Sequence, residues 1–204
     1  MHKPEHNEKL LVRTFGGLTF YRRGAPVSII WESQKARHLF CYLLVSREQW
    51  VSGDKLIGML WPGCVNRDGA NNFKTTLSRL RKSFTGPQAI NPVITSGDVY
   101  RINGDVMEID AGLFRQKALE GIKLFARGEA KGARGCLEAA QDLYTGEFLP
   151  EEPDDNCIGA ERRELAGLHG MALRYLGEIY RKEGDPQALE AFLYLNRSIL
   201  EGTS

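Results

Sequence analysis

Residues 69–84 read GANNFKTTLSRLRKSF, and this stretch decides the fold expected for the first half of the chain. Its apolar residues recur at helical spacing and form one stripe, made of Phe73, Leu77, Leu80 and Phe84. The rest of the cylinder is basic and rich in hydrogen-bond donors, with no carboxylate after Asp68; it carries Asn71, Lys74, Thr75, Ser78, Arg79, Arg81 and Lys82. A helix with these two sides suits the major groove of DNA. The alternative is an ordinary solvated helix face.

Charge is divided unevenly along the chain. The net charge is only +1, but residues 1–104 hold 15 Lys and Arg against 7 Asp and Glu, whereas residues 105–204 hold 12 against 19. The two halves therefore carry +8 and −7. This asymmetry indicates that the first half alone meets a polyanion, unless the halves are simply two domains that are solvated differently.

Composition is typical of a globular protein from a reducing compartment. Hydrophobic residues make up 42% and charged residues 26% of the chain. The four cysteines are scattered and form no CxxC pair, so they indicate neither a disulfide framework nor a zinc site; they are Cys41, Cys64, Cys136 and Cys157. The start, MHKPEHNEKL, contains no apolar run typical of a signal peptide, and no segment approaches membrane-spanning length. We therefore expect a cytoplasmic protein with no membrane partner.

The segments around residues 69–84 predict a winged helix-turn-helix. Residues 10–31 contain short β-like runs punctuated by glycines, which predict an antiparallel meander. Ser33 is placed to cap a first helix, and a short second helix follows over residues 54–60. After the basic helix, VITSGDVYRI predicts a β-hairpin that turns near residues 96–98. Strands, three helices and a hairpin, in this order, are the elements of a winged helix.

These segments resemble a known family. KARHLFCYLL, DKLIGMLWPG, NNFKTTLSRLRKSF and VYRI are similar to the antibiotic-regulatory-protein (SARP) type of bacterial transcriptional activators, which begin with an OmpR-type winged helix. LWPG followed by NN-x5-SRLR is the specific part of the match. The resemblance implies that Phe73, Leu77 and Leu80 are core residues. It also implies which residues face the groove, namely Lys74, Thr75, Ser78, Arg79 and Lys82.

Four more residues complete the expected DNA interface. Asn71 belongs to the polar face of the same helix. Lys35 and Arg37, at the start of the first helix, are expected to contact phosphates, which sets register without reading sequence. Arg101 is the basic residue near the hairpin turn, although Asp98 occupies the turn itself and argues against a tight contact of the wing with the minor groove.

From residue 110 onward the pattern is helical. Four apolar faces follow one another, the last made of Ala188, Leu189, Phe192, Leu195 and Ile199. Helices joined by short Gly-containing turns predict an antiparallel repeat array. VMEIDAGLF, DLYTGEFLPEEPDD and AERREL resemble the bacterial transcriptional activator domain of the same family, a fold of tetratricopeptide-like helix pairs. The chain stops at Ser204, one or two pairs before the usual end, so we expect a shortened member or the front piece of a longer regulator.

The expected fold is therefore an α+β winged helix-turn-helix with an N-terminal β-meander over residues 8–104, followed by an all-α tetratricopeptide-like helical-repeat domain over residues 105–204. Motifs for catalysis are missing: the chain has no GxxxxGK[ST] loop and no GxSxG elbow, and its four histidines lack metal-ligand spacing. The acidic run EEPDD, residues 151–155, lacks the spacing of a calcium loop, so we expect a solvated loop there. The sequence predicts no enzyme, cofactor, metal or small-molecule ligand.

The function that these features predict is sequence-specific binding of double-stranded DNA by a transcription regulator, an activator according to the resemblance. The helical half would contact RNA polymerase or another protomer on tandem DNA repeats. The alternative is a non-enzymatic protein–protein interaction scaffold, in which the helical half binds a partner and the winged helix does not bind DNA. Packing of the basic helix against an acidic surface would favour this alternative.

Overall fold

The computed structural model describes residues 9–63, 67–85, 89–184 and 186–201, so Cys64 lies outside the described residues. The chain forms two compact units. Unit 1 consists of Met1–Arg13, Leu18–Ile109 and Glu151–Ile158, and unit 2 of Thr14–Gly17, Asp110–Pro150 and Gly159–Ser204. Each unit thus includes a short segment from the other half of the sequence.

A four-stranded mixed sheet with the order β3-β2-β1-β7 belongs to unit 1. Its strands are β1 (Leu10–Arg13), β2 (Thr19–Arg22), β3 (Ala25–Val27) and β7 (Met107–Ile109). The first three form the expected antiparallel meander, whereas β7 pairs in parallel with β1, with Leu10 opposite Met107. Because β7 completes the sheet of unit 1, the compact units divide between Ile109 and Asp110, and not between residues 104 and 105.

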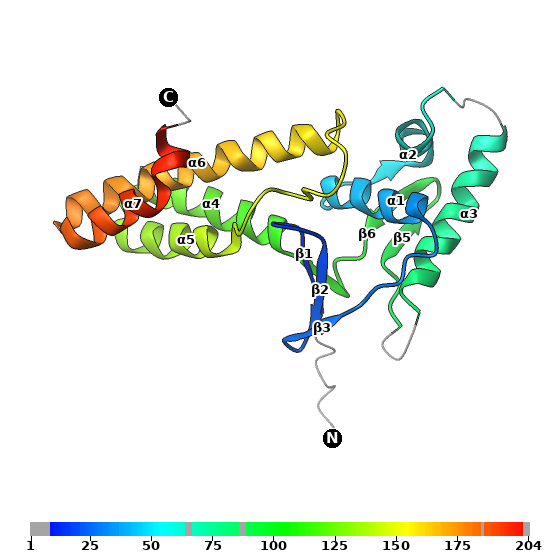
Figure 1. Ribbon diagram of the computed structural model, residues 1–204, viewed down its shortest axis with the longest axis horizontal. Coiled ribbons are helices and arrows are strands. Elements are labelled where there is room, and N and C mark those ends of the chain that lie inside the picture. The colour runs from blue at the N-terminus through cyan, green and yellow to red at the C-terminus, as the bar shows by residue number, and fades with distance from the viewer. Residues whose placement is uncertain (1–8, 64–66, 86–88, 185, 202–204) are drawn as a thin grey trace, which may run out of the picture. The chain divides into compact units, whose positions relative to one another are not determined.

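Three helices and a second sheet complete unit 1 (Figure 1). They are α1 (Gln34–Val45), α2 (Gly53–Leu60) and α3 (Arg67–Ser83), with β4 (Val51–Ser52), β5 (Val93–Ser96) and β6 (Val99–Ile102) in the order β4-β6-β5. Ser33 caps α1, as expected, by accepting a hydrogen bond from the Ala36 N–H at 3.1 Å, and Ser52 caps α2 through the Lys55 N–H. This is a winged helix-turn-helix, so the fold expected for the first half is confirmed.

The core of unit 1 lies where the three helices meet the two sheets. Leu39, Leu56 and Leu80 are fully buried there. An aromatic cluster joins the first sheet to α1 and α3, with ring centroids 5.3–6.2 Å apart; its members are Phe20, Trp31, Phe40 and Phe84. Each aromatic ring buries a large apolar surface, so this cluster fixes the end of α3 against the rest of the unit.

The acidic run at residues 151–155 is only partly solvated, which corrects the expectation from sequence: Glu151, Pro153 and Asp154 are exposed, but Glu152 is buried. Within unit 1 it lies against α1, and the Glu152 side chain is only 1% exposed. Glu152 pairs with Arg37 and lies 3.4 Å from the Nε2 atom of His38. Glu151 accepts a second hydrogen bond from Arg37, at 2.9 Å. The run is ordered because α1 presents a cation and an imidazole on the side that faces it.

The end of the acidic run is also fixed. Tyr42 of α1 donates its hydroxyl to Asp155 at 2.6 Å, and burial together with this carboxylate raises the pKa of the tyrosine. The other Asp155 oxygen accepts from the N–H groups of Cys157 and Ile158, at 2.8 Å each. Asp155 therefore satisfies backbone donors where the next helix begins, as an N-capping residue does.

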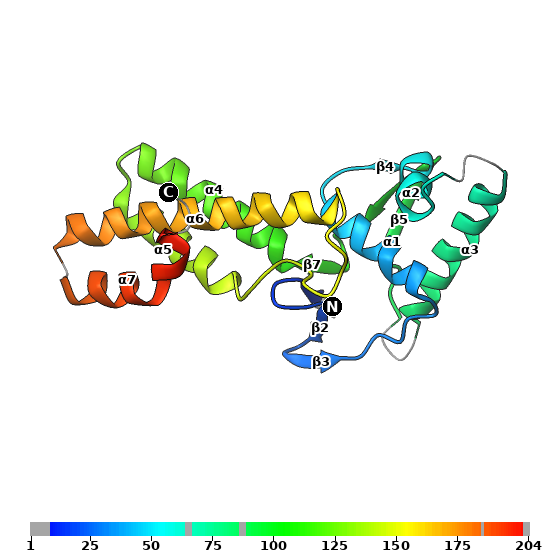
Figure 2. The ribbon, with the colours of Figure 1, turned by 45° about the horizontal axis from the view of Figure 1, so that its top comes forward.

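The described residues of unit 2 form four helices, arranged as two antiparallel hairpins (Figures 1 and 2). They are α4 (Asp110–Ala126), α5 (Ala130–Leu143), α6 (Ile158–Glu183) and α7 (Pro186–Glu201). A Cβ atom on Gly121 of α4 would lie 2.6 Å from the Cγ atom of Leu137 of α5, so glycine permits the close approach of this pair. In the second hairpin, Phe192 packs on Tyr180 with ring centroids 5.3 Å apart. No described helix is long and apolar enough to cross a membrane.

The apolar face expected for α7 is wrong at Leu195, which is 76% exposed. Asn196 is buried in its place; its amide donates to the Phe192 carbonyl at 2.9 Å and accepts from Gln141 of α5 at 3.4 Å. In the sequence LYLN, residues 193–196, the apolar pattern assigned the buried position to Leu195. The helix instead turns Asn196 inward, where its amide meets a polar partner. The side chain of Ala188 lies outside the described part of this helix.

Residues 14–17 join unit 2 through Asp110, the first residue of α4. The carboxylate is buried and accepts from the Thr14 N–H at 2.8 Å and from the Phe15 N–H at 3.2 Å. Burial raises the pKa of Asp110, although these hydrogen bonds oppose the shift. The Phe15 ring then packs edge-on against Phe114, with centroids 5.4 Å apart.

His169 of α6 lies in the aromatic core of unit 2. Its ring stacks on Tyr144 with centroids 4.0 Å apart and meets the edge of Phe114 at 6.2 Å. The residue is 4% exposed, and its Nε2 atom has no hydrogen-bond partner among the described residues. Burial lowers the pKa of this imidazole from 6.5 to about 4, because desolvation disfavours the charged form.

Acid is therefore expected to destabilise the protein through His169. The unfolded chain binds the proton at a higher pH than the folded chain, so stability is complete above pH 6.5 and is lost as the pH falls toward 4. At pH 4 the loss of stability from this group is about 3 kcal/mol. Urea unfolding at several pH values measures it, with His169→Phe as the comparison. The variant should lose less stability over this range; identical pH profiles would contradict the assignment.

Candidate nucleic-acid interface

α3 presents the predicted polar face to solvent. Six exposed side chains recur at intervals that place them on one side of the helix; they are Asn71, Lys74, Thr75, Ser78, Arg79 and Lys82. These are the α3 residues that the sequence assigns to DNA, and the structure brings all six together. In Figures 1 and 2, α3 lies at the edge of unit 1, with α1 and α2 on its other side.

The opposite side of α3 is buried, as predicted. The exposed fractions are 3%, 7% and 0% for Phe73, Leu77 and Leu80. Ser83, at the end of the helix, donates its hydroxyl to the Arg79 carbonyl at 3.0 Å and accepts from the Glu32 N–H at 3.0 Å. Burial of one side and this fixed end determine which residues α3 turns toward solvent.

Arg81 ties α3 to the hairpin, a role that the sequence did not indicate. Its Nη2 atom donates to the Thr95 hydroxyl at 2.8 Å and to the Val93 carbonyl at 3.3 Å. Phe73 adds an edge-on contact with Tyr100 of β6, with centroids 4.9 Å apart. The wing is thereby held in a defined position beside α3. The only sign of this role in the sequence is the position of Arg81 at the border between the apolar and polar sides of the helix.

The hairpin turn packs against the start of α2. The Gly53 N–H donates to the Asp98 carbonyl at 3.0 Å, and a Cβ atom on Gly53 would lie 2.7 Å from the Asp98 carboxylate. Glycine therefore permits the close approach. A carboxylate near the N-terminus of a helix is stabilised by the helix dipole, so Asp98 has a structural role in the turn.

Arg101 lies on β6, opposite Ile94 of β5. Its guanidinium carbon is 4.7 Å from the ring centroid of Trp50, whose side chain is 43% exposed. A cation–π contact at an exposed site contributes about 0.5–1 kcal/mol, so Trp50 orients this arginine. The structure places Arg101 on the wing and not on the exposed face of α3.

The two α1 residues that were predicted to contact phosphates are engaged within unit 1. Lys35 donates to the Leu60 carbonyl at 2.6 Å, where α2 ends, and lies 5.7 Å from the ring centroid of Trp61. Arg37 pairs with Glu152 of the acidic run. Both residues therefore make contacts within unit 1, and their contact with DNA stays a prediction.

Electrostatics on the α3 face leave the cations available to a ligand. Lys82 pairs with Glu32 at 3.1 Å, but its side chain is 68% exposed. An exposed ion pair contributes about 0–1 kcal/mol, so a phosphate can replace Glu32. Among the described residues, no group of three or more His, Cys, Asp or Glu is placed to hold a metal ion. The arrangement can donate hydrogen bonds and neutralise anions along one side of a helix.

Comparisons with known proteins bear on the fold. No family model and no curated protein matches the chain. A solved structure of Mycobacterium tuberculosis EmbR, in complex with a low-affinity phosphopeptide, shares the fold with a TM-score of 0.75 and 23% sequence identity. The match covers 94% of this chain and 51% of the EmbR chain, so this chain spans about half the length of that protein. The likeness shows a winged helix followed by a helical domain.

Proposed function

We propose that the protein is a transcription regulator that binds double-stranded DNA sequence-specifically, with α3 in the major groove. The observation that carries the proposal is the exposed side of α3, where six donors and cations lie together. Residues 69–83 contain no Asp or Glu, so the helix itself places no carboxylate among these donors, and the nearby Glu32 carboxylate is paired with Lys82. The buried opposite side and the contact of Arg81 with Thr95 hold the helix rigidly, as base readout requires.

Different residues of this face take different roles. Arg79, on the exposed stripe, is suited to a bidentate contact with guanine, and Asn71 to adenine. Thr75 and Ser78 can bond to base edges or phosphates. Lys74 and Lys82 lie on either side of Arg79 along the helix and are suited to phosphates, which contribute affinity without sequence preference.

Unit 2 is proposed to contact protein partners. Its four helices form antiparallel hairpins of a kind that builds binding surfaces in helical-repeat proteins. The solved EmbR structure contains a bound peptide, which is consistent with a regulator that meets other proteins. RNA polymerase or a second protomer on tandem DNA repeats is the partner proposed here, and activation is the proposed outcome.

DNA affinity is expected to fall steeply as salt rises, because Lys and Arg displace counterions from the duplex. Each neutralised phosphate contributes roughly −0.9 to the slope of log affinity against log salt. Fluorescence anisotropy of the full chain with a labelled random duplex at several salt concentrations measures this slope. Lys74→Gln should make this slope shallower by about the contribution of one phosphate. Lys131 is an exposed residue of unit 2, and Lys131→Gln should leave the slope unchanged.

A flat salt response, or no binding at low salt, would contradict the proposal. The protein would then be the non-enzymatic scaffold that the sequence leaves as the alternative. Equal effects of the two lysine substitutions would show that the chain attracts DNA only through its general charge, and not through α3.

A further inference from the structure

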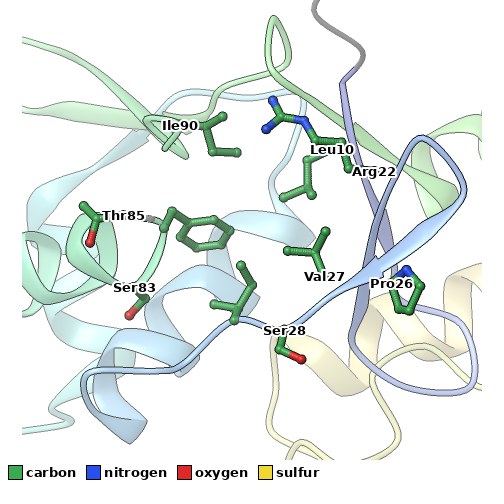
Figure 3. A pocket seen from close by; sticks show the side chains of 10 residues that line it. Leu10, Arg22, Pro26, Val27, Ser28, Ser83, Thr85 and Ile90 are labelled. Carbon is green, nitrogen blue, oxygen red and sulfur yellow. The ribbon is translucent and has the colours of Figure 1, made fainter. Parts of the chain in front are cut away.

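A cavity of about 280 Å³ lies between the first sheet of unit 1 and the end of α3 (Figure 3). Its lining mixes apolar side chains, such as Leu10 and Ile90, with polar ones. The Thr85 hydroxyl donates to a backbone carbonyl of α3 at 2.6 Å, and Ser83 bonds at both its donor and acceptor sides. Arg22 also interacts within the protein. Since these polar groups are engaged, a surface of unit 2 is the stronger candidate for a ligand.

Two large apolar side chains of unit 2 are exposed on helices that lie side by side. Leu119 of α4 is 51% exposed, and Met171 of α6 is 38% exposed. A single exposed apolar side chain is common on protein surfaces. Two of them form a binding surface only if they lie together, and the contacts between α4 and α6 decide this.

Two contacts determine how α4 and α6 are aligned (Figures 1 and 2). Nearer the start of both helices, Arg115 pairs with Glu164. Further along both helices, Phe125 packs on Tyr175 with ring centroids 4.9 Å apart. The two helices are therefore parallel neighbours, and both exposed side chains lie between these contacts along their helices.

Helical spacing places the two exposed side chains on the same side of the helix pair. Leu119 follows Arg115 by four residues, and Met171 precedes Tyr175 by four residues, which is about one turn in each case. Both side chains thus continue the rows of residues that join the helices. The half-buried Ile122 and Tyr175 belong to the same rows. We call Leu119, Ile122, Met171 and Tyr175 the α4–α6 seam.

Lysine side chains lie where the seam ends. Lys182 is in the last turn of α6, and its Nζ atom is 4.8 Å from the ring centroid of Phe125. This cation–π contact holds the ammonium group beside the seam. Lys123 is in the last turn of α4, four residues after Leu119, and is exposed. A ligand on the seam would therefore meet cations from both helices at this end.

The carboxylates of these last turns leave a positive balance. Glu183 pairs with an arginine of α5 at 2.6 Å. Glu120 is the next residue after Leu119 and so lies about 100° away from it around α4. Glu178 is exposed one turn before Lys182, but Arg181 adds a further cation to the last turn of α6. The end of the seam thus has the charge that an acidic ligand requires.

We propose that the α4–α6 seam binds a short acidic segment of a partner protein, with apolar side chains on Leu119 and Met171 and carboxylates on Lys123 and Lys182. The charge at the end of the seam selects this occupant, because a basic segment would be repelled there. The proposal rests on the proposed role of unit 2 in contacting protein partners, and it adds the surface and the chemistry of the partner.

A short synthetic peptide of alternating leucine and aspartate is the probe, titrated into the full chain with methyl-labelled methionine. The NMR methyl signal of Met171 is expected to shift saturably, with a Kd on the order of 1 mM or tighter. The signal of Met107, which is 2% exposed, should stay in place. The same peptide with lysine in place of aspartate should bind at least about tenfold more weakly. A shift that does not saturate, or equal affinity for both peptides, would overturn the proposal.

Two matched pairs of variants test the location. Lys123→Gln should weaken the acidic peptide by about threefold to tenfold, whereas Lys117→Gln, at an exposed position on the opposite side of α4, should not. Leu119→Gln should weaken it by about fivefold or more, whereas Leu193→Gln, at an exposed position of α7, should not. Equal effects within either pair would overturn the seam. Should Leu119→Gln fail to fold, the lysine pair decides alone.

DNA binding by the same proteins separates this proposal from the proposed function. Leu119→Gln should bind a labelled duplex as the wild type does, because the expected DNA-binding residues lie in unit 1. Wild-type DNA binding without saturable peptide binding would overturn the seam and leave the DNA role standing. Saturable peptide binding by a chain that does not bind DNA would support the seam and contradict the DNA role.

Discussion

Replacing Arg37 by Met is expected to lower the free energy of unfolding by about 3–5 kcal/mol. The substitution keeps most of the volume of the side chain but removes the permanent cation that faces Glu152. That carboxylate is 1% exposed and cannot recover its hydration while the chain stays folded. A buried charge that loses its partner is far more costly than an exposed pair that is broken. Urea unfolding followed by tryptophan fluorescence measures the loss.

Two variants separate this effect from a general effect of losing an arginine. Arg79→Met removes an exposed charge from α3 and should change stability by less than about 0.5 kcal/mol. Arg37→Met combined with Glu152→Leu should recover most of the loss, because no buried charge then remains. Unchanged stability of the single variant, with a shallower salt dependence of DNA binding, would instead show that Arg37 contacts a phosphate.

Local patterns predicted the parts of the fold that one segment determines by itself. The alternation of apolar and polar residues in α3 was sufficient, because a helix repeats every 3.6 residues whatever surrounds it. Caps such as Ser33 were predicted for the same reason: the donor that it satisfies lies three residues away. The order of strands, helices and hairpin followed from these local signals.

Long-range pairings could not be predicted in this way. β7 is a three-residue strand whose partner, β1, lies about 97 residues earlier in the register of Leu10 with Met107. The charges of residues 151–155 look the same in sequence whether they face water or α1. Nothing in the sequence around Arg37 indicates that it pairs with Glu152, far along the chain. A division of the chain at residue 104 therefore omits two segments that belong to unit 1, and a fragment of residues 1–104 would lack both.

The candidate site shows the same limit. The six α3 residues were assigned correctly to one exposed face, since helical phase alone determines it. The neighbours that position the site were missed, because Trp50 meets Arg101 only after β4 pairs with β6. Arg81 meets Thr95 only after the hairpin packs on α3. Such contacts depend on tertiary structure, and residue type alone does not distinguish an arginine that binds DNA from one that holds the wing.

Leu80→Ala and Arg79→Ala are expected to affect different properties, stability and DNA discrimination respectively, although the two residues are neighbours on α3. Leu80 is fully buried, so its truncation should leave a cavity and cost about 2–5 kcal/mol of stability. Its effect on DNA affinity, measured below the unfolding transition, should be small. Arg79 is exposed, and its truncation should change stability by less than about 0.5 kcal/mol. A bidentate contact of Arg79 with guanine would instead be lost as about 1–3 kcal/mol of discrimination between sites.

Thermal unfolding and anisotropy titrations on the same two proteins decide the matter. A stability loss confined to Leu80→Ala and a specificity loss confined to Arg79→Ala would place the buried and DNA-facing sides of α3 as proposed. Equal destabilisation would mean that the helix turns a different side to solvent. Unaltered DNA binding by Arg79→Ala, with its stability intact, would remove this arginine from the interface. Lys74 would then be the next residue to test, because it lies five positions earlier on the same exposed stripe.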